Sequence, residues 1–172
     1  MTKDSIIAQP LSRRDIRIIT NRIKELVGLS GQFYFPIVHF IEHIMPQIYD
    51  DFCCEIVSIS EMSGRYAEAL PQLNLMRIRE DVYENALADI GRDRFTLAHE
   101  VGHFILHGEG RVALARASDE NIPAYRKPEW QANTFAGELL IPIHLIRGKS
   151  ETAIADLCKV SLQAAEIQKS VA

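Results

Sequence analysis

The sequence has no long apolar run and no recognisable targeting segment. None of its hydrophobic stretches approaches the roughly 20 residues that a helix needs to cross a bilayer. Residues 1–10 have neither the apolar core nor the small-residue cleavage site of a secretory signal. These absences predict a cytoplasmic protein without a membrane segment.

Cysteines are also scarce, and they do not form a pattern. The three are Cys53, Cys54 and Cys158. An odd number without metal-binding spacing predicts reduced thiols, which are typical of the cytosol. Cys53 and Cys54 are adjacent and should point to opposite faces of a strand, so we do not expect them to share a metal ion.

Positive charge is not in excess. Lys and Arg number 19 against 23 Asp and Glu, so the net charge is -4 at pH 7. This balance argues against direct nucleic-acid binding, which usually requires a strongly basic domain. The 172 residues are 47% hydrophobic and 24% charged, as in ordinary globular proteins. We therefore expect a folded domain rather than a disordered or coiled-coil chain.

The order of predicted elements indicates an α+β fold in a single domain over residues 11–172, after a flexible arm over residues 1–10. Apolar residues at helical spacing, together with capping residues and prolines, predict the helices. Predicted helices run from Ser12 to a stop at Gly28, from Pro36 to about Met45 where Pro46 ends the helix, and over 82–88, 94–107, 129–140, 151–158 and 161–168. A buried strand is predicted over 52–60 and a half-exposed strand over 73–79.

The first predicted helix carries many basic residues. They are Arg13, Arg14, Arg17, Arg22 and Lys24. We interpret this set as a solvated face of the helix.

The sharpest chemical signal is the segment His99-Glu100-Val101-Gly102-His103. Two histidines four residues apart share one face of a helix, and each can give one nitrogen to the same Zn²⁺ ion. Glu100 then sits beside the metal, where it can accept a proton from water as the catalytic acid/base. The apolar residues around the motif predict a buried helix, and buried polar side chains need a partner.

A catalytic zinc site needs a third protein ligand. The downstream acids are Glu109, Asp119, Glu120, Glu129 and Glu138. We favour Glu129, because it opens a predicted helix that a loop can return against the first one. Asn133 lies one turn after Glu129 on the same face, and its side-chain oxygen can accept a hydrogen bond from a metal-binding histidine. The same ligands also suit Mn²⁺ or Fe²⁺.

Two segments resemble the ImmA/IrrE family of zinc metallopeptidases, which have an HExxH, gluzincin-like site. One runs from Arg92 through the histidine motif to Leu106-His107, and the other is Glu129-Trp130-Gln131-Ala132-Asn133-Thr134-Phe135-Ala136-Gly137-Glu138-Leu139-Leu140-Ile141-Pro142. The family often has Glu where Gln131 stands and Met where Ile141 stands. The resemblance is firm over residues 81–142 and loose over 36–79.

The resemblance implies a compact zincin-like domain with a small, mostly antiparallel sheet, an active-site HExxH helix and C-terminal helices. It places the zinc ligands on His99, His103 and Glu129 and the catalytic role on Glu100. It also implies a protein substrate, a helix-turn-helix repressor in a mobile-element or stress response.

Other histidines offer alternatives. His39-Phe40-Ile41-Glu42-His43 matches the inverted zinc motif, although we favour a packing helix there. His107 lies too far from His99 along the helix to share its ion, so we expect it to cap the helix or face the cleft. His144 and Tyr125 are candidates for stabilising the transition state.

The two last helices, over 150–172, resemble a helix-turn-helix but carry few basic residues, among them Lys159 and Lys169. We interpret them as a helical cap packed on the rest of the domain, or as a docking surface. Two functions then remain: a zinc endopeptidase, or a non-catalytic zinc-containing regulator that binds a repressor or DNA without cutting. An intact Glu100 favours the peptidase. We also expect a substrate to pair with the strand over 73–79.

Overall fold

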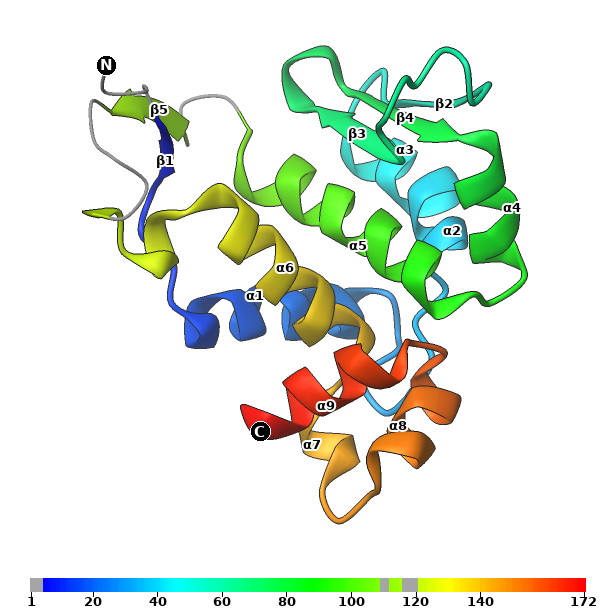
Figure 1. Cartoon of the computed structure of the whole chain (residues 1–172), viewed down its shortest axis with the longest axis vertical. Coiled ribbons are helices and arrows are strands. Elements are labelled where there is room, and N and C mark those ends of the chain that lie inside the picture. Colours follow the sequence, from blue (N-terminus) through cyan, green and yellow to red (C-terminus); the bar gives the residue numbers. More distant parts are fainter. Residues whose placement is uncertain (1–4, 109–111, 116–120) are drawn as a thin grey trace.

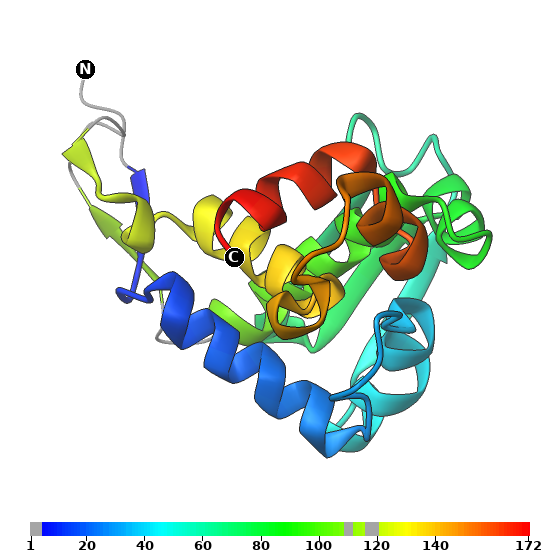
Figure 2. The same cartoon turned by 90° about the horizontal axis from the view of Figure 1, so that it is seen from below.

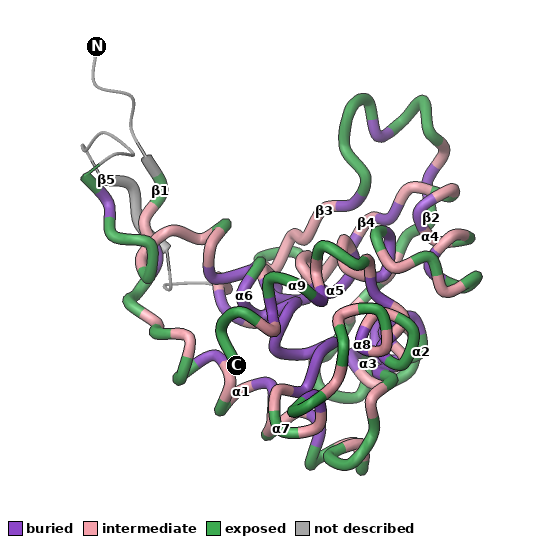
Figure 3. The backbone as a smooth tube through the Cα atoms, turned by 60° about the horizontal axis from the view of Figure 1, so that its bottom comes forward, coloured by how far each residue is buried: buried purple, intermediate pink, exposed green. Residues whose placement is uncertain are grey.

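A computed structural model describes residues 5–108, 112–115 and 121–172 of the chain (Figure 1). Its centre is helix α5 (Gly91–Leu106), which lies between a small sheet on one side and helix α6 (Pro128–Leu140) on the other. Fully buried residues such as Leu97, Val101 and Phe135 join α5 to α6. Figure 3 shows the buried residues gathered along these two helices. The α+β class expected from the sequence is confirmed.

The sheet has three strands and is mixed. They are β2 (Cys53–Val57), β3 (Ala67–Leu70) and β4 (Leu75–Arg79). The order is β2-β4-β3, with β2 parallel and β3 antiparallel to β4. β4 therefore occupies the centre, paired on both sides. The expected pairing of a substrate with residues 73–79 is wrong for this reason, and among the described strands β3 is the edge strand that contacts α5.

β2 is an edge strand rather than the buried strand that its apolar composition predicts. Only Val57 of its five residues is buried, and Ile56 is 44% exposed. An edge strand is covered on fewer sides than a central strand. The prediction of burial was wrong because composition does not show which position a strand takes in a sheet.

The first helix, α1 (Arg13–Leu26), begins as expected. Ser12 and Asp15 form a capping box, in which the Ser12 hydroxyl accepts from the Asp15 amide and the Asp15 carboxylate accepts from the Ser12 amide. Ile16 is fully buried against the core. The end of the helix lies just before Gly28, which has a positive φ of 71°.

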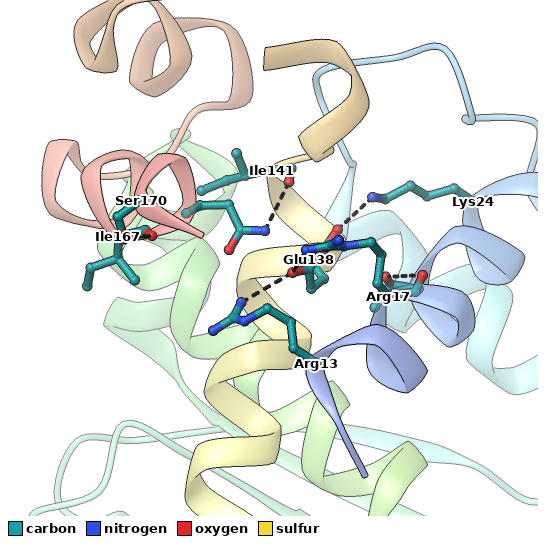
Figure 4. A network of polar contacts seen from close by, with 9 residues as sticks. Arg13, Arg17, Lys24, Glu138, Ile141, Ile167 and Ser170 are labelled. Atoms are coloured by element: carbon teal, nitrogen blue, oxygen red, sulfur yellow. Dashed lines mark hydrogen bonds and ion pairs between the residues drawn. The ribbon is translucent and has the colours of Figure 1, made fainter. Parts of the chain in front are cut away.

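The basic residues of α1 do not all face solvent, in contrast to the expectation (Figure 4). The carboxylate of Glu138 on α6 is buried and accepts from Arg13 Nη1 at 3.2 Å and from Arg17 Nε at 2.8 Å. The Lys24 ammonium donates to the Glu138 carbonyl oxygen at 2.7 Å and is itself buried. These bonds hold α1 on α6, because a buried carboxylate requires paired donors.

The helix predicted after Pro36 continues past Pro46. It consists of α2 (Ile37–His39), a π-helical turn (Phe40–Ile44) and α3 (Met45–Ile48). Pro46 lies in the first turn of α3, where an amide has no helical acceptor to lose. Proline therefore does not end the segment.

Helices α4 (Glu80–Leu87), α8 (Glu151–Cys158) and α9 (Leu162–Ser170) agree closely with the sequence-based ranges. The short helix α7 (Ile143–Ile146) and the 3₁₀ turns over Pro71–Leu73 and Ala124–Arg126 were not predicted. Ser150 and Ser161 cap α8 and α9 by accepting from Ala153 N and Ala164 N. Figure 2 shows α8 and α9 seen from below, with α1 along the opposite side. Within the described residues, no helix combines the length and apolar character that crossing a membrane requires.

The N-terminal segment, expected as a loose arm over residues 1–10, contains a strand. β1 (Ser5–Ala8) pairs antiparallel with β5 (Val112–Ala115), with Ser5 opposite Ala115. Residues 1–4 of the arm lie outside the described residues. The ladder partner lies more than 100 positions along the chain, so local sequence could not reveal this strand.

The α8–α9 pair packs against the start of α5. Ile154, Cys158 and Ala165 are buried in the common core. A Cβ built on Gly91 would lie 2.5 Å from Ser161 N and 2.7 Å from Val160 Cα, so the two backbones are in direct contact. Arg94 Nε also donates to the Lys159 carbonyl at 2.9 Å.

Candidate metal centre

His99 and His103 lie one turn apart on α5 and face the first turn of α6. Their ring centroids are 4.6 Å apart, and their Nε2 atoms are 2.9 Å apart. Both side chains are half-buried. The helical spacing alone brings the two nitrogens to one point, as two ligands of a single ion require.

Glu129, in the first turn of α6, contacts both histidines. Its Oε1 lies 3.2 Å from His103 Nε2 and its Oε2 lies 3.4 Å from His99 Nε2. One ligand atom from each of the three residues fits within 4.8 Å, and no other such group of three occurs among the described residues. The Glu129 side chain is 75% exposed, so the group opens to solvent on that side. Two imidazoles and one carboxylate with an open position are the donor set of a catalytic zinc site.

The protonation state of His103 fits a metal ligand. Burial, with further contributions from His99 and His107, lowers the pKa of His103 to about 3. The imidazole is therefore neutral near pH 7 and keeps a lone pair for a cation. The donor chemistry of the described residues thus fits a divalent metal ion.

Gly102 allows α5 and α6 to approach closely at this point. A Cβ added to Gly102 would lie 3.1 Å from Phe135 Cβ and 3.2 Å from Ala132 Cα. These contacts are tighter than packed carbon atoms normally make. The short distance between the helices is what lets Glu129 reach both histidines.

Glu100 follows His99 on α5 and reaches strand β3 of the sheet. Its Oε2 accepts a 2.9 Å hydrogen bond from the backbone N–H of Ala69 on β3. Burial, opposed by that hydrogen bond and supported by the negative charge of Glu129, raises the pKa of Glu100 to about 7. A carboxyl with a pKa near neutrality can both accept and return a proton at physiological pH.

A cleft of about 310 Å³ opens beside His99 and Glu100. The segment before β3, the first half of α5 and one residue of α6 line it. The lining residues are Arg65, Tyr66, Ala67, Phe95, Thr96, His99, Glu100 and Asn133. The cleft therefore extends from His99, one of the candidate ligands, to Ala67 at the start of β3.

Hydrogen bonds orient the candidate ligands from behind. Asn133 Oδ1 lies 2.9 Å from His99 Nδ1, the nitrogen that faces away from the centre. His107 Nδ1 lies 2.9 Å from His103 Nδ1, and its Nε2 lies 2.8 Å from Gln131 Oε1. Gln131 was not predicted from the sequence as a member of the site. The only signal for His107 was its spacing four residues after His103, and nothing in the sequence predicted the contact with Gln131.

The structure does not bring the other candidates to this centre. His144 on α7 contacts the carbonyl oxygen of Ser30 through Nε2 at 3.0 Å. Tyr125 is 47% exposed, and its carbonyl accepts from Gln131 and from Leu11. Neither residue lines the cleft beside Glu100.

The inverted motif likewise gains no third ligand from the described residues. His39 and His43 stack with ring centroids 4.7 Å apart, and the Glu42 carboxylate accepts from the Tyr83 hydroxyl at 2.6 Å. Phe40 and Ile41 of the same segment are buried in the core. The segment therefore packs as a helix with its polar residues at the surface.

Comparisons with known proteins agree with this geometry. A family model described as the IrrE N-terminal-like domain (Peptidase_M78) matches residues 55–168. No curated protein matches the chain. A solved structure named "Mycobacterium tuberculosis transcriptional regulator" has a similar fold, with a TM-score of 0.54 and 15% sequence identity. The match covers 88% of this chain but only 45% of that protein, so the chain spans less than half of its length.

Proposed function

Because the chain belongs to the family of IrrE N-terminal-like domains (Peptidase_M78), we propose that it is a zinc-dependent endopeptidase of the cytosol that cleaves a helix-turn-helix transcriptional repressor. The observation that carries the proposal is that Glu100 lines the same cleft as His99, one of the three residues that can hold a metal ion. A purely structural metal site does not need a proton acceptor next to it. The resemblance noted in the sequence supports the choice of substrate.

In this function His99, His103 and Glu129 hold the metal ion through two nitrogens and one carboxylate oxygen. Zinc, when bound, supplies a Lewis acid that lowers the pKa of water and polarises a peptide carbonyl. The hydrogen bond between Asn133 and His99 keeps the His99 ring oriented toward the centre. Mn²⁺ or Fe²⁺ would suit the same ligands.

Glu100 carries the proton. It accepts one from the attacking water while the new C–O bond forms at the peptide carbonyl. It then donates that proton to the departing nitrogen as the C–N bond breaks, so that the products are a carboxylic acid and an amine. The hydrogen bond from Ala69 N–H holds one Glu100 oxygen and leaves the other for the water.

The free edge of β3 is suited to bind an extended substrate. Successive residues of a strand direct their backbone groups to opposite sides, so every second residue faces the same side, and Ala69 N–H turns away from β4 toward Glu100. Ala67 therefore presents its backbone groups on the same unpaired side, where it also lines the cleft. A substrate strand added to this edge would pass in front of Glu100 and the metal ligands.

The test is cleavage of a purified helix-turn-helix repressor by the protein with zinc and with a chelator. We expect cleavage with zinc, none with the chelator, and none by His103→Ala. His43→Ala is the matched control, because it also removes a histidine from a helical segment, but at the surface, and should cleave like the wild type. Cleavage that persists in His103→Ala and fails in His43→Ala would assign the reaction to the inverted motif instead.

A regulator that binds a repressor or DNA without cutting it is the second candidate. It is supported by the structural neighbour from Mycobacterium tuberculosis, which is called a transcriptional regulator. Such a protein would bind its partner equally well with and without Glu100, and the partner would stay intact under all metal conditions.

A further inference from the structure

A continuous series of hydrogen bonds connects the N-terminal segment to His103. Gln131 is fully buried, and its side-chain nitrogen donates to the carbonyl oxygens of Gln9 at 2.8 Å and Tyr125 at 2.7 Å. Its Oε1 lies 2.8 Å from His107 Nε2, and His107 Nδ1 lies 2.9 Å from His103 Nδ1. Each step of this series places one polar atom against another at hydrogen-bond distance.

The two carbonyl oxygens fix the direction of the first step. A carbonyl oxygen can only accept a hydrogen bond. The Gln131 amide nitrogen must therefore face the carbonyls of Gln9 and Tyr125, and it donates one hydrogen to each. The oxygen of the same amide then faces His107 and can only accept. His107 must therefore carry its hydrogen on Nε2 and donate it to Gln131.

The hydrogen on His103 is fixed in turn by His107. A neutral imidazole has one hydrogen, so His107 with a hydrogen on Nε2 has a bare Nδ1 that accepts. His103 Nδ1 must then donate to it. His103 Nε2 is left without a hydrogen and turns its lone pair toward Glu129 and His99.

We propose that Gln131 and His107 are positioning residues that fix the tautomer and ring orientation of His103 so that its Nε2 lone pair is available to a divalent cation. The inference rests on the proposed metal site but not on peptidase activity. It assigns different supports to the two histidines: Asn133 holds His99 directly, whereas His103 depends on a two-residue relay.

The relay also makes the metal site depend on the N-terminal segment. Gln9 directly follows β1. Two residues later, the backbone N–H of Leu11 donates to the carbonyl oxygen of Tyr125 at 3.0 Å. One carbonyl of each segment thus holds the Gln131 amide in its orientation. Displacing residues 5–11 would free Gln131 to turn its amide over, which would exchange donor and acceptor toward His107.

The first test is nuclear magnetic resonance of the metal-free protein labelled with ¹⁵N-histidine at pH 8, where ordinary imidazoles are neutral. Long-range ¹H–¹⁵N correlations report which ring nitrogen carries hydrogen. We expect His103 and His99 to carry it on Nδ1 and His107 on Nε2. A hydrogen on His103 Nε2 in the wild type would overturn the proposal, without any variant being needed.

The second test compares zinc affinity, measured by competition with a chromogenic chelator, in Gln131→Met and Gln131→Glu. Methionine keeps the length of the side chain but cannot accept from His107, so we expect zinc affinity to fall roughly 10–100-fold. Glutamate that is protonated on the oxygen replacing the amide nitrogen still accepts from His107 Nε2 and donates to one of the two carbonyl oxygens, so we expect it to retain the His103 tautomer and most of the affinity.

Equal losses of affinity in the two Gln131 variants would show that Gln131 only fills space, and the proposal would be wrong. The proposal would also be wrong if Gln131→Met lost zinc affinity while the tautomer of His103 stayed unchanged. If the wild type bound no zinc at all, the proposed metal site itself would fail, while the tautomer of His103 in the metal-free protein would still be decided by the spectra.

Discussion

The backbone N–H of Ala69 on the edge strand β3 donates a 2.9 Å hydrogen bond to the carboxylate of Glu100 on α5. This bond ties the residue proposed to move the proton to the strand proposed to bind the substrate. A change in the position of β3 therefore changes the position of Glu100 as well. The proposed proton-transfer residue and the proposed substrate-binding edge should therefore move together.

Replacing Glu100 with Gln should preserve binding and remove cleavage. The amide has the shape of the carboxylate but cannot accept the proton of water, and loss of a general base typically slows a reaction by about 10²–10⁴-fold. We expect Glu100→Gln to bind zinc like the wild type and to form an uncut complex with the repressor that can be isolated by gel filtration. Cleavage at the wild-type rate by Glu100→Gln would contradict the assigned role.

Replacing Glu129 with Ala should strongly weaken metal binding. The change removes the one anionic ligand and leaves two neutral imidazoles, which bind a dication poorly. Isothermal titration with zinc should show the loss. Glu166→Ala is a matched control, because Glu166 is an exposed acid on α9, away from the centre. Equal zinc affinity in Glu129→Ala and Glu166→Ala would mean that the third ligand is another residue.

Lys24 should make the stability of the protein rise with pH above about 8. Burial lowers the pKa of Lys24 from 10.5 to about 8 in the native state, so between these values the unfolded chain binds more protons. The free energy of unfolding therefore increases across this interval, by up to about 3 kcal/mol for this residue. Urea unfolding measured from pH 7 to 10.5 should show that the free energy of unfolding of the wild type rises relative to that of Lys24→Met. A constant difference between the two would disprove the effect.

Replacing Gly91 with Ala should destabilise the fold. The added methyl group would lie 2.5 Å from Ser161 N, and a backbone atom cannot rotate away as a side chain can. We expect a loss of at least about 1–3 kcal/mol in the free energy of unfolding, because α5 and the α8–α9 pair must separate. Gly31→Ala is the control, since its Cβ would meet nothing within 4 Å. If the two variants had similar free energies of unfolding, the backbone contact between Gly91 and Ser161 would adjust to a methyl group at little cost.

Local signals in the sequence predicted those parts of the fold that depend on neighbouring residues. The capping box at Ser12 and the caps at Ser150 and Ser161 depend on residues three positions apart, so they could be identified directly. The parallel pairing of β2 with β4 could not, because it depends on how the chain crosses over between them. The burial of Lys24 depends on Glu138, which lies 114 positions away.

The candidate site divides in the same way. The pairing of His99 with His103 follows from helical spacing, whereas the approach of Glu129 needs α6 to pack on α5. The spacing and the resemblance led to these three residues, and their roles as ligands stay predictions. The contact between His107 and Gln131 was not predictable, because it joins the end of one helix to the buried side of another.

Gly102, which carries no side chain, lies where α5 and α6 approach each other beside the proposed metal site. It lies beside His103 on α5 and lets Phe135 and Ala132 of α6 come close to its backbone. A larger residue there would move Glu129 away from both histidines without altering any ligand. At the proposed metal site, the spacing of these two backbones would therefore set which ionic radius fits, and engineering the site for a larger ion would begin at this glycine rather than at the three proposed ligands.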